Sequence, residues 1–415
     1  MSHLTLYEEQ SALNHVKNLA FSRRAATDGE TKSITYIVRE LDKNNIQTSV
    51  EAFEWYISST ILMKLAIIFT FIYLVIYGII SFYPNITWSY LPLDILFITI
   101  IYYGEKFLFN NTKILHFGTK KESKNVITKI FGKDIYPQRP VIIFSAHHDS
   151  ISQRYSMRMK IVLYISALIL FFAYFIFTFI LSIWSLLALF SITKIDYNFI
   201  FLRNISLIIE GFLLITMIAI LGNKDSNQSI GAIDNASGVA ILLELAKLIN
   251  KNPLEKTDVI FFWSGAEEIG CMGSKDYCSK HFEELNYDYD LNDSYIINID
   301  MVGTYVAFLD KTGLLKKKKI NSNLNNVLEA SAIHIKSSIE KETITLGTFS
   351  DHKIFQSLAK KAGKNNFQAS VFSSDRDTKY IHSKKDTPDK CSTTNLNACI
   401  DICYNAIKSL DLRVE

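Results

Sequence analysis

Acidic and imidazole side chains follow short apolar segments in this 415-residue chain, where they could bind a metal ion. The candidates are His147, Asp149, Asp234, Glu267, Glu268, Asp300 and His382. Carboxylates that converge on one place repel one another unless a cation neutralises them. Two histidines and three carboxylates are what a pair of borderline divalent ions such as Zn²⁺ would bind, with one carboxylate bridging the pair. Because such ions acidify the water that they bind, the residue types indicate hydrolysis near neutral pH.

A tight turn followed by an apolar helix positions Asp234. The stretch GAIDNASGVAILLELAKLI, from Gly231 to Ile249, places this carboxylate among small polar residues, directly before apolar side chains at helical spacing. The small residues that follow it let an ion and its other ligands approach the backbone closely. A plain N-capped core helix is the alternative for this stretch taken alone, because Asp and Ser are ordinary capping residues.

Three short buried strands position most of the other candidates. These strands are expected at Val141–Ala146, Val259–Trp263 and Tyr295–Ile299, and a last helix begins near Thr394. Each strand ends just before one or more of the candidate residues. Since ligand sites in α/β folds lie at the carboxyl ends of strands, we expect these side chains to meet at one edge of a sheet.

Four long apolar segments interrupt the α/β pattern. They are Ile61–Phe82, Ile86–Tyr103, Ile161–Thr193 and Phe199–Gly222. A hydrophobic content of 49% and a mean hydropathy of +0.14 are too high for an ordinary soluble enzyme. About 20 apolar residues cross the roughly 30 Å of hydrocarbon in a bilayer as a helix. We therefore predict an integral, multi-pass membrane protein with a lipid bilayer as one partner.

Polar residues complicate two of the apolar segments. Pro92 and Asp94 interrupt the second segment, for which a buried amphipathic helix is the alternative. Arg203 and Glu210 lie seven residues apart in the fourth segment, on one helix face, so they could pair or face a protein interior. A solvated position near the interface is the alternative for Arg203.

Charge and cysteine usage exclude some classes of function. With 44 basic and 41 acidic residues the net charge is only +3, which provides no general attraction for nucleic acid. The five cysteines are odd in number and contain no CxxC pair, so we expect reduced thiols rather than disulfides or zinc ligands. Residues Met1–Glu51 lack the features of a secretory signal peptide.

A family resemblance rests on six motifs that follow one another in the order HHDS, GAIDNASG, WSGAEEIGCMGS, NIDMVG, SDHKIF and HSKKDT. They resemble the successive motifs of the M28 family of zinc aminopeptidases. The resemblance covers Thr31–Phe53 weakly and both Asn125–Ser150 and the chain from Gly231 onward well. It implies an α/β fold with a mixed central β-sheet flanked by helices, into which about four transmembrane helices are inserted. We therefore expect a catalytic domain of residues 1–57, 111–158 and 224–415, and two transmembrane hairpins of residues 58–110 and 159–223.

The resemblance implies a role for each candidate ligand. Asp234 would bridge two zinc ions. His147 and Asp300 would complete one metal site, and Glu268 and His382 the other.

Further residues receive roles from the same resemblance. Glu267 would be the general base, and Asp149 would accept the second ring N–H of His147 and so fix its tautomer. His352, in the SDH motif, would line the site. Tyr380 is a candidate oxyanion donor, because strand alternation would point its side chain to the same face as that of His382.

The function implied is that of a membrane-anchored di-zinc aminopeptidase, which hydrolyses N-terminal residues from peptides with a free N-terminus. Two other functions stay open on the same fold. One is a glutaminyl cyclase that uses a single zinc, although the intact DNASG and AEE motifs argue against it. The other is a non-catalytic peptide-binding protein, which would have no need for Glu267.

The metal ligands also constrain membrane topology. His147 and Asp234 must reach the same ions, so the apolar block between them crosses the bilayer an even number of times. Basic residues near the helix ends gather on the side of the catalytic domain, which places that domain in the cytoplasm by the positive-inside rule. A lumenal or external domain is the alternative, as in other members of the family.

Overall fold

The chain divides into two compact units in a computed structural model that describes residues 10–109, 116–313, 316–345 and 347–414. The first, here called the sheet unit, comprises Met1–Ile57, Thr112–Gln153 and Asp225–Glu415. The second, here called the helical unit, comprises Ser58–Asn111 and Arg154–Lys224. Each unit is therefore built from segments that are distant in the sequence.

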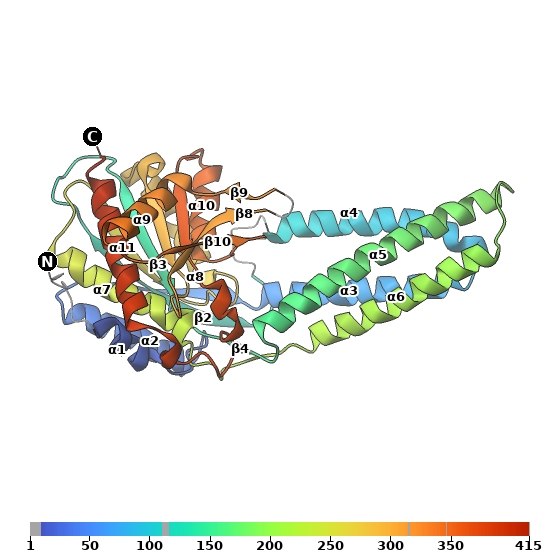
Figure 1. Ribbon diagram of the computed structural model, residues 1–415, viewed down its shortest axis with the longest axis horizontal. Helices are drawn as coiled ribbons and strands as arrows, with labels where there is room; N and C mark the ends of the chain where they lie inside the picture. Colours follow the sequence, from blue (N-terminus) through green and yellow to red (C-terminus); the bar gives the residue numbers. More distant parts are fainter. Residues whose placement is uncertain (1–9, 110–115, 314–315, 346, 415) are drawn as a thin grey trace. The chain divides into compact units, whose positions relative to one another are not determined.

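A mixed β-sheet forms the centre of the sheet unit, as the sequence predicts (Figure 1). Its strands, in the spatial order β1-β2-β6-β3-β7-β11-β8-β10, are β1 (Ser49–Tyr56), β2 (Lys120–Ile130), β6 (Asp258–Ser264), β3 (Val141–His147), β7 (Tyr295–Ile299), β11 (Gln368–Phe372), β8 (Ala307–Thr312) and β10 (Glu340–Ile344), with β9 (Lys318–Lys319) paired to β8. The four central strands, β6, β3, β7 and β11, run parallel to one another. Their carboxyl ends therefore meet at one edge of the sheet.

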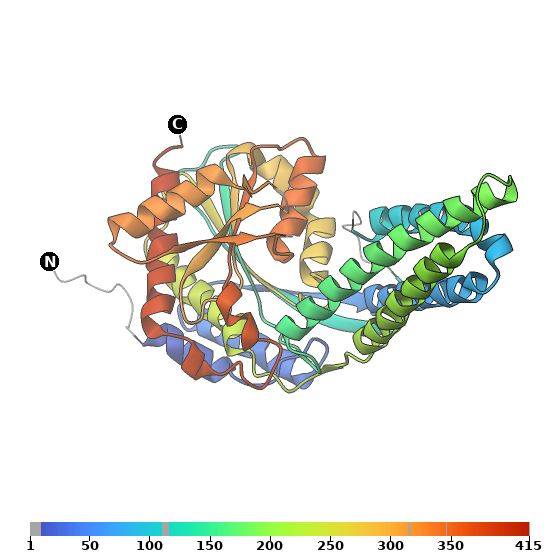
Figure 2. The ribbon, with the colours of Figure 1, turned by 45° about the vertical axis from the view of Figure 1, so that its right-hand side comes forward.

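Helices cover both faces of this sheet (Figure 2). They are α1 (Ser11–Leu19), α2 (Asp28–Asp42), α7 (Ser237–Lys251), α8 (Met272–Asp288), α9 (Ser322–His334), α10 (Asp351–Lys361) and α11 (Thr393–Asp411). Helix α7 packs on the central strands and is covered in turn by α1, α2 and α11. Helices α8 and α10 pack together over a core that includes Ile143, Ile260 and Phe262. This fully buried core makes the sheet a rigid base for the residues at its edge.

The structure confirms the main elements predicted from the sequence and moves some boundaries. The predicted strands at Val141–Ala146, Val259–Trp263 and Tyr295–Ile299 correspond to β3, β6 and β7, and the last helix, predicted near Thr394, is α11, which begins at Thr393. As predicted, Asp234 lies in a turn, at Ala232–Ala236, and the apolar helix follows it as α7, which begins at Ser237. Asp234 therefore precedes the helix, which leaves its carboxylate free to face a site.

Four long apolar helices make up the helical unit. They are α3 (Ser58–Ser81), α4 (Tyr90–Phe109), α5 (Met157–Leu189) and α6 (Tyr197–Leu221), with a 3₁₀ turn at Pro84–Ser89 before α4. All four are long and apolar enough to cross a membrane, judged by length and composition alone. Their outward surface is rich in exposed Ile, Leu and Phe side chains, which is typical of helices that face lipid.

Buried polar groups join these helices to one another. On α4, one carboxylate oxygen of Asp94 accepts hydrogen bonds from the hydroxyls of Tyr73, at 2.6 Å, and Tyr77, both on α3. On α6, Glu210 accepts one from Tyr174 of α5 at 3.1 Å. Arg203 instead donates to the side chain of Asn204 at 3.0 Å. Of the two alternatives for Glu210, the structure therefore supports the interior position rather than a pair with Arg203.

Both segments of the helical unit interrupt the sheet unit between paired strand ends. Tyr56 of β1, just before the first segment, lies opposite Lys120 of β2, which follows that segment. Strand β4 (Ser152–Gln153), just before the second segment, pairs with β5 (Asp225–Ser226), which follows it. Each insertion therefore leaves and re-enters the sheet unit at nearly the same place.

Candidate metal centre

The five predicted metal ligands converge at the carboxyl edge of the central strands. His147 is the last residue of β3, Asp300 follows β7, and Glu268 follows β6. His382 comes after β11, and Asp234 lies in the turn before α7. Parallel strand order thus assembles residues that are up to 235 positions apart in the chain, as the sequence predicted.

The carboxylate of Asp234 lies between two imidazoles. Its Oδ1 is 3.0 Å from Nε2 of His147, and its Oδ2 is 3.2 Å from Nε2 of His382. Oδ1 of Asp300 lies 3.5 Å from the same nitrogen of His147. Oε2 of Glu268 lies 3.0 Å from the same nitrogen of His382. The donors therefore form two groups of three that share Asp234.

The donor set fits divalent metal ions. One ligand atom from each of His147, Asp234 and Glu268 lies within 4.8 Å of the other two. The second carboxylate oxygen of Glu268, Oε1, is buried and has no hydrogen-bond partner among the described residues. Imidazole nitrogens and carboxylate oxygens at such spacing are the ligands that zinc prefers, and a cation would remove the repulsion between the carboxylates.

The ionisation of the ligands reflects this crowding. Burial alone would lower the pKa of His382, but the charge of Glu268 and the hydrogen bond that the imidazole donates to Asp234 raise it to about 10. Burial also raises the pKa of Glu268 itself.

Asp149 binds more groups than the sequence predicted. Its Oδ1 lies 3.4 Å from Nδ1 of His147, close to the contact we expected, although the same nitrogen is nearer, at 3.2 Å, to the backbone carbonyl of Asp149. The two carboxylate oxygens also accept hydrogen bonds from the backbone N–H groups of Glu267, at 3.1 Å, and Glu268, at 3.3 Å. One buried side chain therefore holds the loop after β3 against the loop after β6.

We expect Asp149→Asn to weaken metal affinity about 10- to 100-fold, as losses of groups that orient metal ligands usually do. Only the oxygen of the amide can accept a hydrogen bond, so the substitution would leave one of the two backbone N–H groups unpaired. It would also remove the negative charge beside His147. A matched control is Asp411→Asn, because Asp411 is also buried and accepts the backbone N–H groups of Glu255 and Lys256 at 2.8 and 2.9 Å. Metal titration of both variants tests this, and equal affinities would reduce Asp149 to a structural role.

Glu267 lies in the same loop but outside both groups of ligand atoms. One of its carboxylate oxygens accepts a hydrogen bond from the thiol of Cys271 at 3.5 Å. Burial and the charges of nearby carboxylates raise its pKa well above the usual value of a glutamate, although the charge of His147 acts in the opposite direction. A buried carboxyl group with a raised pKa is typical of residues that accept and return protons.

The structure gives different results for the two further candidates. His352 lies in the first turn of α10, fully buried, and neither ring nitrogen has a hydrogen-bond partner among the described residues. The strand argument for Tyr380 is wrong, because residues 375–385 form a 3₁₀ helix and turns rather than a strand. His382 takes a left-handed conformation there, with φ of 54°, so the two side chains do not alternate as in a strand.

Sequence reasoning missed residues that hold the turn around Asp234. The carboxylate of Asp386 accepts the backbone N–H groups of Ile233, at 2.6 Å, and Asp234, at 3.2 Å. The side chain of Asn235 donates to the carbonyl of Ile299 at 2.7 Å, which ties the turn to the end of β7. Asp386 lies within the HSKKDT motif, and Asn235 within DNASG, so their motifs were the available signal.

The comparisons with known proteins agree with this geometry. Residues 217–407 match the sequence profile described as Peptidase family M28. This part of the chain is therefore similar to the peptidases of family M28. Over 126 residues the chain is 32% identical to Aminopeptidase YwaD from Bacillus subtilis (strain 168), an alignment that covers 30% of this chain and only about a quarter, 26%, of that relative. The matched profile and this relative both describe peptidases.

Solved structures share the fold of this chain. BSAP, a zinc aminopeptidase from Bacillus subtilis, superposes with a TM-score of 0.52 at 14% identity, covering 97% of this chain and 95% of that chain. Fimbriiglobus ruber glutaminyl cyclase superposes with a TM-score of 0.53 at 14% identity, also covering 97% and 95%. Because both activities occur on this fold, the fold by itself does not separate them.

The region that matches the profile includes Asp234, Glu268, Asp300 and His382 but begins after His147. Strand β3 pairs with both β6 and β7, which brings His147 from outside this region next to the other candidate ligands. The candidate metal centre is therefore complete only with the segment that precedes the second apolar block.

Proposed function

We propose that the chain is a membrane-anchored di-zinc aminopeptidase that removes N-terminal residues from peptides. The observation that carries this proposal is the position of Asp234, whose two carboxylate oxygens each lie about 3 Å from a different histidine. A carboxylate in that position can bridge two ions. His147 and Asp300 would hold one zinc, and Glu268 and His382 the other.

The residues around the candidate centre would have different roles in amide hydrolysis. Zinc ions bound there would acidify water and polarise the scissile carbonyl. Glu267, in the loop after β6 beside the ligand Glu268, takes the proton from the attacking water and delivers it to the leaving amine. Asp149 holds the loop that carries Glu267 in place through that residue's backbone N–H.

A product panel tests the proposed reaction. The full chain, purified in detergent with zinc, is given aminoacyl amides, the same amides with acetylated amino groups, and a peptide with N-terminal glutamine. We expect release of free amino acids from the unblocked amides alone. Pyroglutamate as the only product would establish the cyclase instead, and binding of these peptides without turnover would establish a binding protein.

The four apolar helices would anchor the enzyme in the bilayer as two hairpins. We propose that residues 1–57, 111–158 and 224–415 form the catalytic domain and that the two intervening segments, residues 58–110 and 159–223, cross the membrane twice each. Two observations support an even number of crossings: Tyr56 pairs with Lys120 around the first segment, and Gln153 pairs with Asp225 around the second. The strands that flank each insertion therefore belong to one soluble unit.

The charges beside the helices favour a cytoplasmic catalytic domain. Basic residues near the domain side of the second hairpin are Arg154, Arg158, Lys160 and Lys224, whereas the turn between α5 and α6 contains only Lys194. Positive residues remain on the cytoplasmic side during insertion.

We expect an impermeant thiol reagent, applied to intact cells, to modify an Ile192→Cys variant and to leave an Asn323→Cys variant unmodified. Ile192 is an exposed residue of the α5–α6 turn, and Asn323 is an exposed residue of α9. The five native cysteines are free but buried, so background labelling is low. Permeabilised cells serve as the control, in which both variants should react. The opposite pattern in intact cells would place the catalytic domain outside the cytoplasm.

A further inference from the structure

A buried arginine connects the loops that carry the proposed ligands. Arg23 lies between α1 and α2, and its side chain is fully buried. Removing a guanidinium from water costs several kcal/mol unless other groups replace its hydrogen bonds, so such a residue requires specific partners. No motif suggested a role for it, because the sequence FSRRAAT resembles an ordinary solvated loop.

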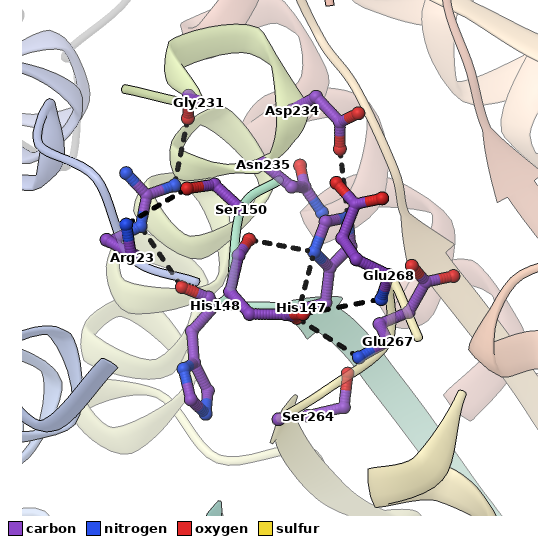
Figure 3. Close-up of polar contacts among 12 residues, drawn as sticks. Arg23, His147, His148, Ser150, Gly231, Asp234, Asn235, Ser264, Glu267 and Glu268 are labelled. Atoms are coloured by element: carbon purple, nitrogen blue, oxygen red, sulfur yellow. Dashed lines mark hydrogen bonds and ion pairs between the residues drawn. The ribbon is translucent and has the colours of Figure 1, made fainter. Parts of the chain in front are cut away.

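The guanidinium of Arg23 donates to carbonyls of two separate segments that carry proposed ligands (Figure 3). Its Nε donates to the carbonyl of His148 at 3.1 Å, directly after the proposed ligand His147. Its Nη2 donates to the carbonyl of Gly231 at 2.9 Å, three residues before Asp234, and its Nη1 to that of Ile230 at 2.7 Å. One planar group therefore spans the loop after β3 and the turn before α7.

The backbone of Arg23 strengthens the same connection. Its N–H donates to the hydroxyl of Ser150 at 3.1 Å, and its carbonyl accepts the N–H of Ser150 at 3.2 Å. Gly231 allows the close approach: a Cβ there would lie 2.7 Å from that of Ser150 and 2.9 Å from Nη2 of Arg23, and its φ of 55° is left-handed. The three segments fit together only with a glycine at this position.

The charge of Arg23 also suits the centre. Burial lowers its pKa to about 10, but the carboxylates of Asp386, Asp149, Asp234 and Glu268 act in the opposite direction. The side chain consequently stays positively charged at neutral pH. It is a fixed cation behind a set of carboxylates, and its described hydrogen bonds all go to neutral carbonyls.

We propose that Arg23 is a positioning residue, which fixes the loop after β3 relative to the turn before α7 so that His147 and Asp234 bind the same ion. The inference rests on the proposed metal-dependent function. Lysine cannot replace arginine in this role, because an ammonium group is a single point with three donors, whereas the planar guanidinium presents five donors in a fixed arrangement. Both charge and shape are therefore required.

Cobalt binding tests the role of Arg23 without relying on turnover. Full-length Arg23→Lys and Arg23→Met variants are prepared in detergent, and Co²⁺ affinity is measured by competition with a chelator. We expect both variants to bind Co²⁺ about 10- to 100-fold more weakly, the usual effect of groups that orient ligands. We also expect the visible absorption of bound Co²⁺ to change, because the ligand geometry changes.

Arg139→Met is the matched control. Arg139 is also largely buried and pairs with Asp258 at 3.0 Å, but Asp258 begins β6 and so lies at the opposite end of that strand from the metal centre. This variant should lose thermal stability and keep wild-type Co²⁺ affinity and spectrum. Wild-type affinity and spectrum in folded Arg23→Met would overturn the proposal, and if Arg23→Met does not fold, the same result in Arg23→Lys would overturn it. If Asp234→Ala also binds Co²⁺ like the wild type, the proposed metal-dependent function fails instead.

Discussion

Glu267→Gln is expected to keep both metal ions and to lose turnover by a factor of about 10² to 10⁴, the usual contribution of a positioned general base. Glutamine has nearly the same size and shape as glutamate, so the loop after β6 should keep its hydrogen bonds to Asp149. An amide, however, cannot accept the proton of the attacking water. Because the carboxylate of Glu267 lies outside both groups of ligand atoms, its loss leaves the ligands intact.

The measurement pairs the rate of aminoacyl amide hydrolysis with metal content per chain. Glu244→Gln is a suitable control, because Glu244 is also a glutamate in the sheet unit but binds His15 and Lys247, on α1 and α7, rather than any candidate ligand. That variant should keep its rate. Near wild-type turnover in Glu267→Gln would remove Glu267 from the mechanism, and loss of metal from it would make Glu267 a ligand.

Asp234→Ala is expected to lose both metal ions and, with them, all turnover above the metal-free protein. Each carboxylate oxygen of Asp234 faces a different histidine, so the substitution removes a ligand from both sites at once. It also removes the negative charge of the carboxylate, which would reduce the repulsion between two neighbouring cations. No other single residue in the described centre contacts both histidines.

Asp258→Ala separates loss of metal from loss of fold. Asp258 is buried to the same degree as Asp234 but accepts from Gly132 and Arg139 at the start of β6. We expect that variant to be less stable and to bind two ions. If Asp234→Ala retained one ion and part of its activity, a single-zinc site would explain the centre better than a bridged pair.

The sequence predicted the elements that carry the ligands because local patterns determine them. The apolar strand 141–146 and the residues after it could be recognised without a structure, as could the helix that follows Asp234. Order along the chain could not give the spatial order of the strands. That β3 lies between β6 and β7, and so brings His147 beside Asp234 and Asp300, depends on tertiary pairing.

The residues that the sequence did not reveal act through the backbone. Arg23 and Asp386 form hydrogen bonds with backbone carbonyls and N–H groups of distant loops. Almost every residue type has these backbone groups, so the sequence does not reveal which of them a side chain will bind. The error at Tyr380 has a similar origin. The prediction assumed that side chains alternate around Tyr380 and His382 as they do in a strand. In the structure this segment forms turns, and the backbone of His382 is left-handed, so the side chains do not alternate.

Metal content per chain tests the central proposal most directly. The full-length protein, purified in detergent and exchanged into zinc-buffered solution, is analysed for zinc beside the Asp234→Ala variant. The proposal predicts two zinc ions per wild-type chain and none in the variant. One ion per wild-type chain, or an equal content in the two proteins, would contradict a di-zinc centre bridged by Asp234.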